Sequence, residues 1–378
     1  MRGELHAGAE ALELLRGPWD ALAVAASRPY GAPAWQLGWW RRAARPDGEP
    51  LALVARDGAH IAGLFALYAT RTPTGLERLR VLGAAMAQGT GPVALPGREP
   101  EVARAFAEAL ALRRGPRPAT LELQGVLDGE RWAALMRDGW PGRARPLLLH
   151  DRRVVAPLVT LAAGIDTLDG WLAGRSANFR QQVRRARRKL ESAGARFHRA
   201  ESPAEIAAVL PALLALHERR FEERGGSAAV DARTEAVLAE VARQAGGGGR
   251  AHVEAIDLDG QTISAHLFLT AGEEMTYWLG GFDDEHAAGK PGLVALVAGV
   301  GTALERGVRR LDLGPGEHPY KYRMADAERH LDWLRLLPPG PRLPLTLAQL
   351  APRWAAREAV RRVPPERIES VRARFRRG

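Results

Sequence analysis

The sequence predicts an α+β fold made of two tandem domains and a basic helical tail. A prior of about 150 residues per domain gives roughly two domains for the 378 residues. Apolar residues make up 46% of the chain and charged residues 26%, which is ordinary for a globular protein. Short strand patterns alternate with amphipathic helix patterns along the chain. We expect domains at residues 1–155 and 156–340, and the tail at 341–378.

The first half shows the weaker patterns, and we expect its first residues to be weakly ordered or helical. Asp57-Gly58 separates two apolar runs and indicates a hairpin. Later segments read as strands at Leu79–Leu82 and Thr120–Leu123 and as helices near Glu99–Arg113 and Glu130–Arg137. Trp35, Trp39 and Trp40 fall at helical spacing, and we interpret them as core anchors rather than as a sugar-binding surface.

The second half has clearer helix signals. Phe179, Val183, Ala186 and Leu190 form one stripe of a helix. Ser202-Pro203-Ala204-Glu205 is a capping box with proline at the first helical position. The remaining expected helices are Ala232–Gln244 and Leu293–Arg306, and the expected strands are Ala195–Ala200, Ala251–Asp257, Gln261–Thr270, Met275–Gly280, Val308–Leu313 and Leu331–Leu337.

Two hairpins resemble each other in sequence. Asp57-Gly58-Ala59-His60-Ile61-Ala62-Gly63-Leu64 is similar to Asp259-Gly260-Gln261-Thr262-Ile263-Ser264-Ala265-His266. The match favours an internal duplication, although two unrelated hairpins can also produce so short a match.

Cysteine and charge restrict the possible chemistry. The chain has no cysteine, which excludes disulfides, Cys-ligated zinc and a thioester on the enzyme. The formal net charge is +10, and the positive residues gather at Asn178–Leu190 and at Arg353–Gly378. No apolar run approaches the roughly 20 residues of a membrane span, and the N-terminus shows no signal peptide, so we expect a cytoplasmic protein.

The second half resembles the GNAT superfamily of acyltransferases, in particular the CelD/BcsL-type acetyltransferases of cellulose biosynthesis. That family is similar to the Fem-type aminoacyl transferases, which carry two GNAT-like domains. The resemblance covers roughly Pro157–Leu337 and rests on several motifs in order: the Arg-rich helix Asn178–Leu190, the strand Ile263–Leu269, the segment Tyr277–Phe282, the helix start Lys290-Pro291-Gly292, and Leu311-Asp312-Leu313-Gly314-Pro315-Gly316 followed by Tyr320-Lys321. It implies two tandem GNAT-like domains, each with a mixed sheet flanked by helices, and direct transfer from acetyl-CoA or another acyl-CoA.

In GNAT domains the donor pyrophosphate lies on the loop before the central helix, where backbone N–H groups and the helix dipole favour anions. The resemblance places this loop at His286–Gly292, with Gly289, Lys290, Pro291 and Gly292 as donor-binding residues. His286 and Pro291 depart from the usual pattern. The alternative is an ordinary loop and helix cap.

Acyl transfer needs a base for the acceptor proton and hydrogen-bond donors for the oxyanion. His266 is the candidate base, because it lies mid-strand and its unperturbed pKa near 6.5 suits neutral pH. A buried histidine bonded to its neighbours is the alternative. We expect no metal in the reaction.

Three further groups complete the candidate site. Asp312 ends a strand where the sheet opens into a cleft, and it is a candidate to orient the base or bind the acceptor. The alternative is a strand-end cap or a salt bridge with Arg309 or Arg310. Lys321 is one of three lysines in an arginine-rich chain and is a candidate for the oxyanion or a phosphate, or else a solvated lysine. Tyr277, Phe282 and Tyr320 are candidate acceptor contacts.

The Arg-rich helix carries Arg184 and Arg188 beside its apolar stripe, either as acceptor contacts or as a solvated face. Our leading hypothesis is acyl transfer to an amine or hydroxyl of a saccharide or cell-envelope precursor. The alternatives are a Fem-like transferase that uses aminoacyl-tRNA and a non-catalytic module that binds anions or nucleic acid. The basic tail is a surface helix or a peripheral membrane contact.

Overall fold

The computed structural model describes residues 1–43, 48–87, 89–113, 119–222 and 232–361. In the first half the strands are β1 (Arg2–Ala7), β2 (Glu49–Asp57), β3 (His60–Arg71), β4 (Glu77–Val81), β5 (Val93–Ala94), β6 (Thr120–Leu127) and β7 (Leu147–Thr160). The helices there are α1 (Ala9–Leu14), α2 (Arg16–Ala25), the short η1 (Pro29–Gly31), α3 (Pro33–Ala43), α4 (Glu99–Ala111) and α5 (Trp132–Asp138).

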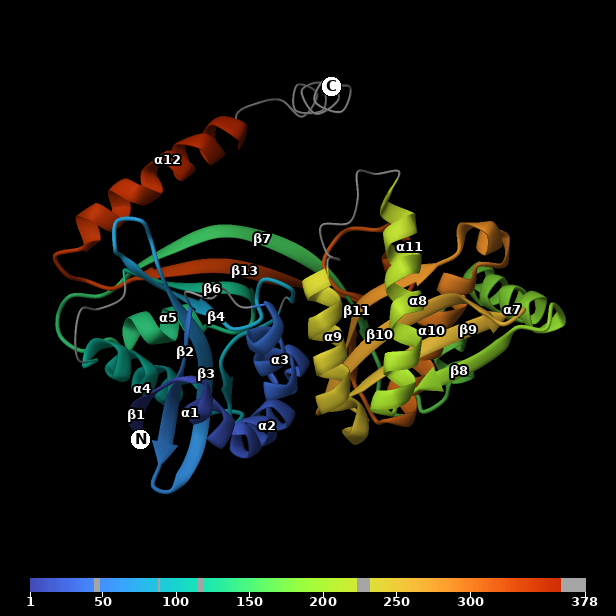
Figure 1. The fold of residues 1–378 in the computed structure, drawn as a ribbon, viewed down its shortest axis with the longest axis horizontal. Helices are drawn as coiled ribbons and strands as arrows, with labels where there is room; N and C mark the ends of the chain where they lie inside the picture. Colours follow the sequence, from blue (N-terminus) through green and yellow to red (C-terminus); the bar gives the residue numbers. More distant parts are fainter. Residues whose placement is uncertain (44–47, 88, 114–118, 223–231, 362–378) are drawn as a thin grey trace.

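The second half begins after β7 (Figure 1). Its strands are β8 (Arg196–Ala200), β9 (Ala251–Leu258), β10 (Gln261–Ala271), β11 (Glu274–Phe282), β12 (Arg310–Asp312) and β13 (Ala327–Leu337). Its helices are α6 (Leu168–Ala173), α7 (Ala177–Ser192), α8 (Pro203–Glu222), α9 (Ala232–Ala245), η2 (Gly246–Gly248), η3 (Asp284–Gly289), α10 (Pro291–Glu305), α11 (Pro319–Tyr322) and α12 (Leu343–Arg361).

One mixed sheet runs through both halves in the order β1-β2-β3-β4-β6-β13-β7-β12-β11-β10-β9-β8, with β5 beside β3. From each end inward, three antiparallel pairings lead to one parallel pairing, β4 with β6 and β11 with β12. An antiparallel partner from the other half then follows: β13 pairs with β6, and β7 pairs with β12. The two halves therefore repeat one topology and exchange their last strands.

The matching hairpins occupy matching places in this repeat, as β2–β3 and β9–β10. This supports a duplicated fold unit over two unrelated hairpins. The α+β prediction with a mixed, helix-flanked sheet in each half is also confirmed.

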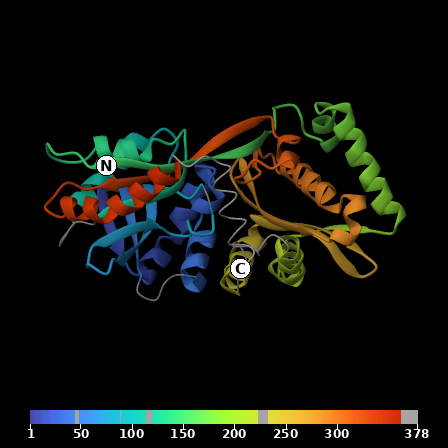
Figure 2. The ribbon, with the colours of Figure 1, turned by 90° about the horizontal axis from the view of Figure 1, so that it is seen from above.

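Helices lie on both faces of the sheet and between the halves (Figures 1 and 2). Helices α4 and α5 cover the outer face of the first-half sheet, and α6, α7 and α10 cover the outer face of the second-half sheet. Between the two halves of the sheet, α2, α3, α8 and α9 share one apolar core with the inner faces of β3 and β10. Trp35 and Trp39 are buried in this core, as expected, and the Trp35 ring lies 5.8 Å from that of Trp278 in the other half.

Local capping signals explain several helix starts. Glu205 accepts a hydrogen bond from the Ser202 backbone N–H (2.9 Å), and the Ser202 hydroxyl accepts one from the Glu205 N–H (3.2 Å), which confirms the capping box of α8. The stripe predicted for α7 is buried as expected, at Phe179, Val183, Ala186 and Leu190.

The structure corrects two expectations at the strands. Residues 2–7 form an edge strand paired with β2, not a loose or helical segment. The predicted boundary at 155/156 falls inside β7, a 14-residue strand that the sequence did not indicate. The middle of β7 is half-exposed and charged, which hides its strand pattern, and cross-strand pairs stabilise it. Arg153 binds Asp332 of β13 at 2.8 Å, and the Arg152 guanidinium lies 3.9 Å from the Trp333 ring centre.

The structure describes only the first part of the predicted tail. The predicted tail begins as α12, and residues 362–378 lie outside the described residues. Among the described residues, no helix combines the length and apolar character that crossing a bilayer requires.

Candidate functional site

A cavity of about 290 Å³ lies on the outer face of the second-half sheet, against the start of α10. Its lining residues are Phe179, Gln182, His266, Tyr277, Phe282, Ala287, Lys290, Gly292, Leu293, Leu296, Tyr320 and Arg323. We call it the second-half cavity. Its charged lining residues are the cations Lys290 and Arg323, and no carboxylate lines it. The site therefore favours an anionic ligand.

His266 lies in the middle of β10 on the face opposite the shared core, and its side chain is buried. Its ring centre lies 5.4 Å from that of Tyr277 on the neighbouring strand. Gly280 lets both side chains approach the backbone, since a Cβ there would lie 2.3 Å from His266 Nδ1 and 2.4 Å from the Tyr277 hydroxyl. The strand pairing and this glycine together fix the imidazole at the cavity.

The α10 start supplies the opposite wall. Lys290 has φ +53°, in the left-handed region, and its carbonyl accepts from the N–H groups of Leu293 (3.1 Å) and Val294 (3.2 Å). Gly292 packs against the Phe282 ring, because a Cβ there would lie 2.7 Å from its Cδ1 atom. Gly289 and Pro291 are buried beside these residues and do not line the cavity.

Asp312 and Lys321 lie outside the cavity lining. Asp312 is buried, accepts from the Gly314 N–H at 2.7 Å and pairs at 2.7 Å with Arg329 of β13 rather than with Arg309 or Arg310. Lys321 is also buried, and its ammonium donates to the carbonyls of Gly314 (3.0 Å) and Pro315 (2.7 Å). The two side chains thus hold one loop from both sides.

The pKa of Lys321 reflects this burial. Desolvation lowers the pKa of Lys321 to about 8, although the negative charge of Asp312 opposes the shift. Lys321 is thus neither solvated nor directed at the cavity. Its contacts are those of a residue that positions the loop between β12 and α11.

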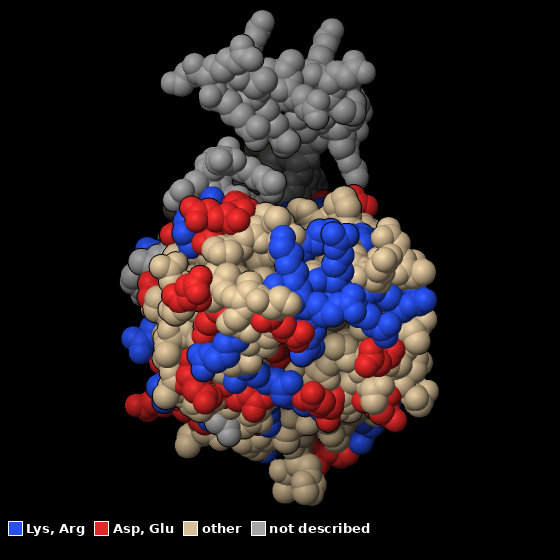
Figure 3. Space-filling model, turned by 90° about the vertical axis from the view of Figure 1, so that its right-hand side faces the viewer, with Lys and Arg blue, Asp and Glu red and all other residues tan. Residues whose placement is uncertain are grey.

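Arg184 and Arg188 are exposed on α7 and do not line the cavity. Arg184 pairs with Asp169 at 3.1 Å. Figure 3 shows Lys and Arg side chains gathered in a patch at the end of the molecule where α7 lies. The exposed basic residues of α7 are Arg184, Arg185, Arg187, Arg188 and Lys189.

The cavity also has lining residues that the sequence did not single out. Phe179 and Gln182 come from the first turns of α7, and Arg323 follows α11. The Arg323 guanidinium lies 5.2 Å from the Phe179 ring centre and donates to the Gln182 side chain. Phe179 was recognised only as part of the buried stripe, and one arginine in so arginine-rich a chain gives no signal.

Residues 177–322 match the family model described as "Acetyltransferase (GNAT) domain". These residues have the fold of a GNAT acetyltransferase domain. The matched segment contains the whole of β8 to α10, including His266 and the α10 start, and the finding supports an acyltransferase.

Solved structures resemble the chain over most of its length. The structure of FemX has a TM-score of 0.59 and 11% identity, covering 80% of this chain and 90% of its own. A conserved protein of unknown function from Bacteroides thetaiotaomicron has a TM-score of 0.53 and 11% identity, covering 86% and 97%. A tandem GNAT protein from the clavulanic acid biosynthesis pathway has a TM-score of 0.47 and 17% identity, covering 90% and 100%. At these identities, the first two establish similarity of fold. A search of curated proteins returned no match.

The described residues contain no group of three or more His, Cys, Asp or Glu side chains that could hold a metal ion.

Proposed function

We propose that the second-half cavity transfers an acyl group from an acyl-CoA to an amine or hydroxyl acceptor. The observation that supports this proposal is that a buried histidine and a cationic helix start line the same cavity. His266 comes from β10, while Lys290 and Gly292 come from the α10 start. A base and a phosphate-binding helix start are the two parts that direct transfer from a CoA thioester needs.

In this proposal His266 acts as the general base. It takes the acceptor proton as the acceptor oxygen or nitrogen bonds to the thioester carbonyl carbon. The C–S bond then breaks, and His266 passes the proton to the sulfur, so that CoA leaves as the thiol. Tyr277, Phe282 and Tyr320 contact the acceptor or acyl chain from the cavity wall. Lys290 and Gly292, which line the cavity, hold the donor phosphates, while Gly289 and Pro291 shape the loop behind them.

Asp312 and Lys321 have positioning roles in the same proposal. Both bind the backbone of the loop after β12, where the parallel pairing of β11 with β12 has ended at Thr276 and Asp312. Fixing this loop fixes the edge of the sheet opening beside the site.

We further propose that the acceptor is a saccharide or a cell-envelope precursor, as the CelD/BcsL-type resemblance implies. The mixture of aromatic and cationic lining suits a polar acceptor with an anionic part. Because acyl-CoA thioesters are metabolites of the cytoplasm, the proposal places the reaction there.

A Fem-like donor, aminoacyl-tRNA, is the second candidate. The observation that favours it is the exposed basic face of α7, a helix whose first turns also line the cavity.

In a non-catalytic module, by contrast, Arg184→Ala and Arg188→Ala would weaken anion binding with a steep salt dependence, while His266→Ala would have no effect.

The first experiment is the shift in melting temperature with acetyl-CoA, with free CoA and ATP as controls. A ligand at 100 times its Kd stabilises the fold by about 2.7 kcal/mol, which raises the melting temperature by several degrees. We expect a rise specific to CoA species. No rise with any CoA ester, together with transfer that requires aminoacyl-tRNA, would contradict the acyl-CoA donor and favour the second candidate.

A further inference from the structure

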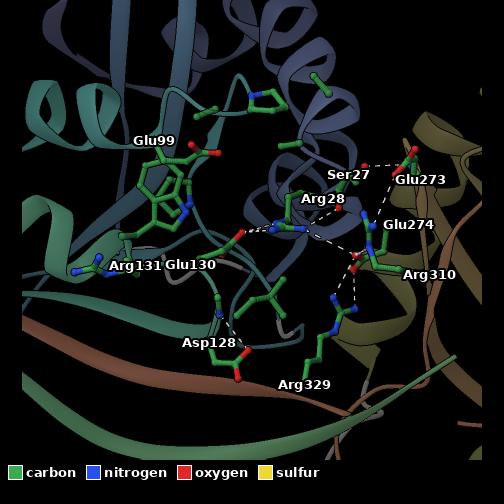
Figure 4. A pocket seen from close by; sticks show the side chains of 18 of the residues that line it. Ser27, Arg28, Glu99, Asp128, Glu130, Arg131, Glu273, Glu274, Arg310 and Arg329 are labelled. Atoms are coloured by element: carbon green, nitrogen blue, oxygen red, sulfur yellow. Dashed lines mark hydrogen bonds and ion pairs between the residues drawn. The ribbon is translucent and has the colours of Figure 1, made fainter. Parts of the chain in front are cut away.

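A larger cavity, of about 760 Å³, lies where the first half meets the second. It is formed by the end of α2, the start of α4, the loop between β6 and α5, and residues of β11, β12 and β13 (Figure 4). We call it the first-half cavity. Its volume falls within the range of about 300–1,000 Å³ that small-molecule sites occupy. It shares no lining residue with the second-half cavity.

The two cavities occupy equivalent places in the repeat. Each lies against the start of the helix that precedes the parallel partner strand, α10 before β12 and α4 before β6. The chemistry at the two helix starts differs. Lys290 and Gly292 line one cavity, whereas Glu99 and Pro100 line the other. Glu99 also accepts the Gly97 N–H at 3.2 Å, so the α4 start presents a negative charge, which disfavours a phosphate there.

The arginines that face the first-half cavity are largely neutralised by internal partners. Arg28 donates to one oxygen of Glu130 at 2.6 Å and to the Ser27 carbonyl at 3.1 Å. Arg329 and Arg310 bind Glu274 at 2.7 and 3.3 Å. Figure 4 shows this chain of ion pairs along one side of the cavity.

Glu274 is the ionised centre of that chain. Burial would raise the pKa of Glu274, but the attraction of Arg329, Arg28 and Arg310 is larger and lowers it. Because these arginines form ion pairs with carboxylates of the protein, they attract an anionic ligand only weakly. Arg131 is the exception, and it lies exposed at the rim.

The cavity lining carries more carboxylates than arginines: Glu99, Asp128, Glu130, Glu273 and Glu274 against Arg28, Arg131, Arg310 and Arg329. Both contacts of Arg28 with Glu130 go to Oε1, and among the described residues Oε2 has no hydrogen bond or ion pair. Glu99 and Asp128 also line the cavity, each accepting a backbone N–H, and Asp128 pairs with His330. The buried indole of Trp132 lines the cavity beside them. Carboxylates next to an aromatic ring are the groups that hold an ammonium ion.

We propose that the first-half cavity binds an organic ammonium ligand, with Glu130 and Glu99 as its ion-pairing residues. The volume accommodates an amine attached to a larger molecule. Burial raises the pKa of Glu130, against the effect of Arg28, so an arriving cation would also relieve an unfavourably buried carboxylate. The site is separate from the transfer site and does not depend on the donor used there.

The test is calorimetric titration of the full chain with putrescine, with 1,4-butanediol as the uncharged molecule of equal length. Spermidine and lysine extend the series to longer and zwitterionic amines. We expect saturable binding of at least one amine and none of the diol. Absence of binding by every amine at millimolar concentration overturns the proposal.

Variants locate the site. Glu99→Gln and Glu130→Gln should each weaken amine binding about tenfold or more. Glu101→Gln removes the same charge from the same first turn of α4, but Glu101 does not line the cavity, so this variant should bind as the wild type does. Unchanged binding in Glu99→Gln overturns the proposal even where Glu130→Gln fails to fold. The melting-temperature shift with acetyl-CoA is read separately, so failure at one cavity is distinguishable from failure at the other.

Discussion

The two halves of this protein share a topology and differ in the chemistry of the cavity at the equivalent helix start. In the second half that cavity contains a buried histidine, aromatic walls and two cations. In the first half no histidine is among the described residues that line the cavity, and the helix start carries Glu99 instead of a lysine. The repeat thus preserves the sheet and the cavity positions, while a few side chains decide what each cavity can bind. Function here belongs to the site and not to the fold.

The largest predicted effect is the loss of turnover when the base is removed. His266→Ala should lower kcat by about 10²- to 10⁴-fold with little change in donor binding, because proton transfer is lost while the helix start is intact. Steady-state kinetics with an identified acceptor, beside the acetyl-CoA melting shift, measure both quantities. His60→Ala, an exposed histidine on the equivalent first-half hairpin, is the control and should be silent. Full turnover in His266→Ala would show that the base has been assigned to the wrong residue.

A smaller effect is expected from displacing the imidazole. In Gly280→Ala the new methyl group would lie 2.3 Å from His266 Nδ1, so the ring must move. Overpacking of this kind costs about 1–3 kcal/mol of stability. We expect turnover to fall at least tenfold while circular dichroism still reports a folded chain. Gly17→Ala is the matched control, since nothing lies within 4 Å of a Cβ there. Equal activity in the two variants would contradict the placement of His266.

Donor binding provides the next comparison. Lys290→Ala should raise the Kd for acetyl-CoA about tenfold by removing one charge-assisted phosphate contact, with kcat nearly unchanged. Lys189→Ala removes an exposed lysine from α7 that does not line the cavity, and its Kd should match the wild type. Isothermal titration of both variants decides. If both lose affinity equally, general surface charge and not the α10 start attracts the donor.

The smallest predicted effect concerns Lys321 and pH. Its pKa is lowered to about 8 in the fold, whereas an unfolded lysine titrates near 10.4. Between these values the unfolded chain holds a proton that the folded chain has released, so the free energy of unfolding rises with pH. Below pH 8 both states are protonated and the buried charge is a constant cost.

We expect the wild type to gain about 1 kcal/mol relative to Lys321→Met between pH 8 and 10, allowing for partial solvent screening. Urea unfolding at several pH values measures the difference. Lys290→Met, at an exposed lysine, should keep the wild-type slope. Parallel curves for wild type and Lys321→Met would show that burial does not perturb this ammonium.

Local signals in the sequence determined much of the fold. Periodicity and capping residues predicted α7, α8 and α10 because they act within one element: the stripe from Phe179 to Leu190 and the capping box at Ser202 need no distant partner. The hairpins β2–β3 and β9–β10 were readable for the same reason, since an Asp-Gly turn and its flanking strands are adjacent in the chain. The residues around His266 and Lys290 could be singled out because the GNAT resemblance rests on local motifs.

Contacts between distant segments were decided only by the tertiary structure. Strand β7 is stabilised by β13 and β12, whose residues lie more than 140 positions away, so its own charged middle gave no strand pattern. Lys321 and Asp312 looked like site residues in one dimension. Only the fold showed their contacts: Lys321 donates to the Gly314 and Pro315 carbonyls, and Asp312 accepts the Gly314 N–H and pairs with Arg329 of β13. The first-half cavity could not be predicted from the sequence for the same physical reason. Arg28, Glu130 and Glu274 line it, and only folding brings these residues together.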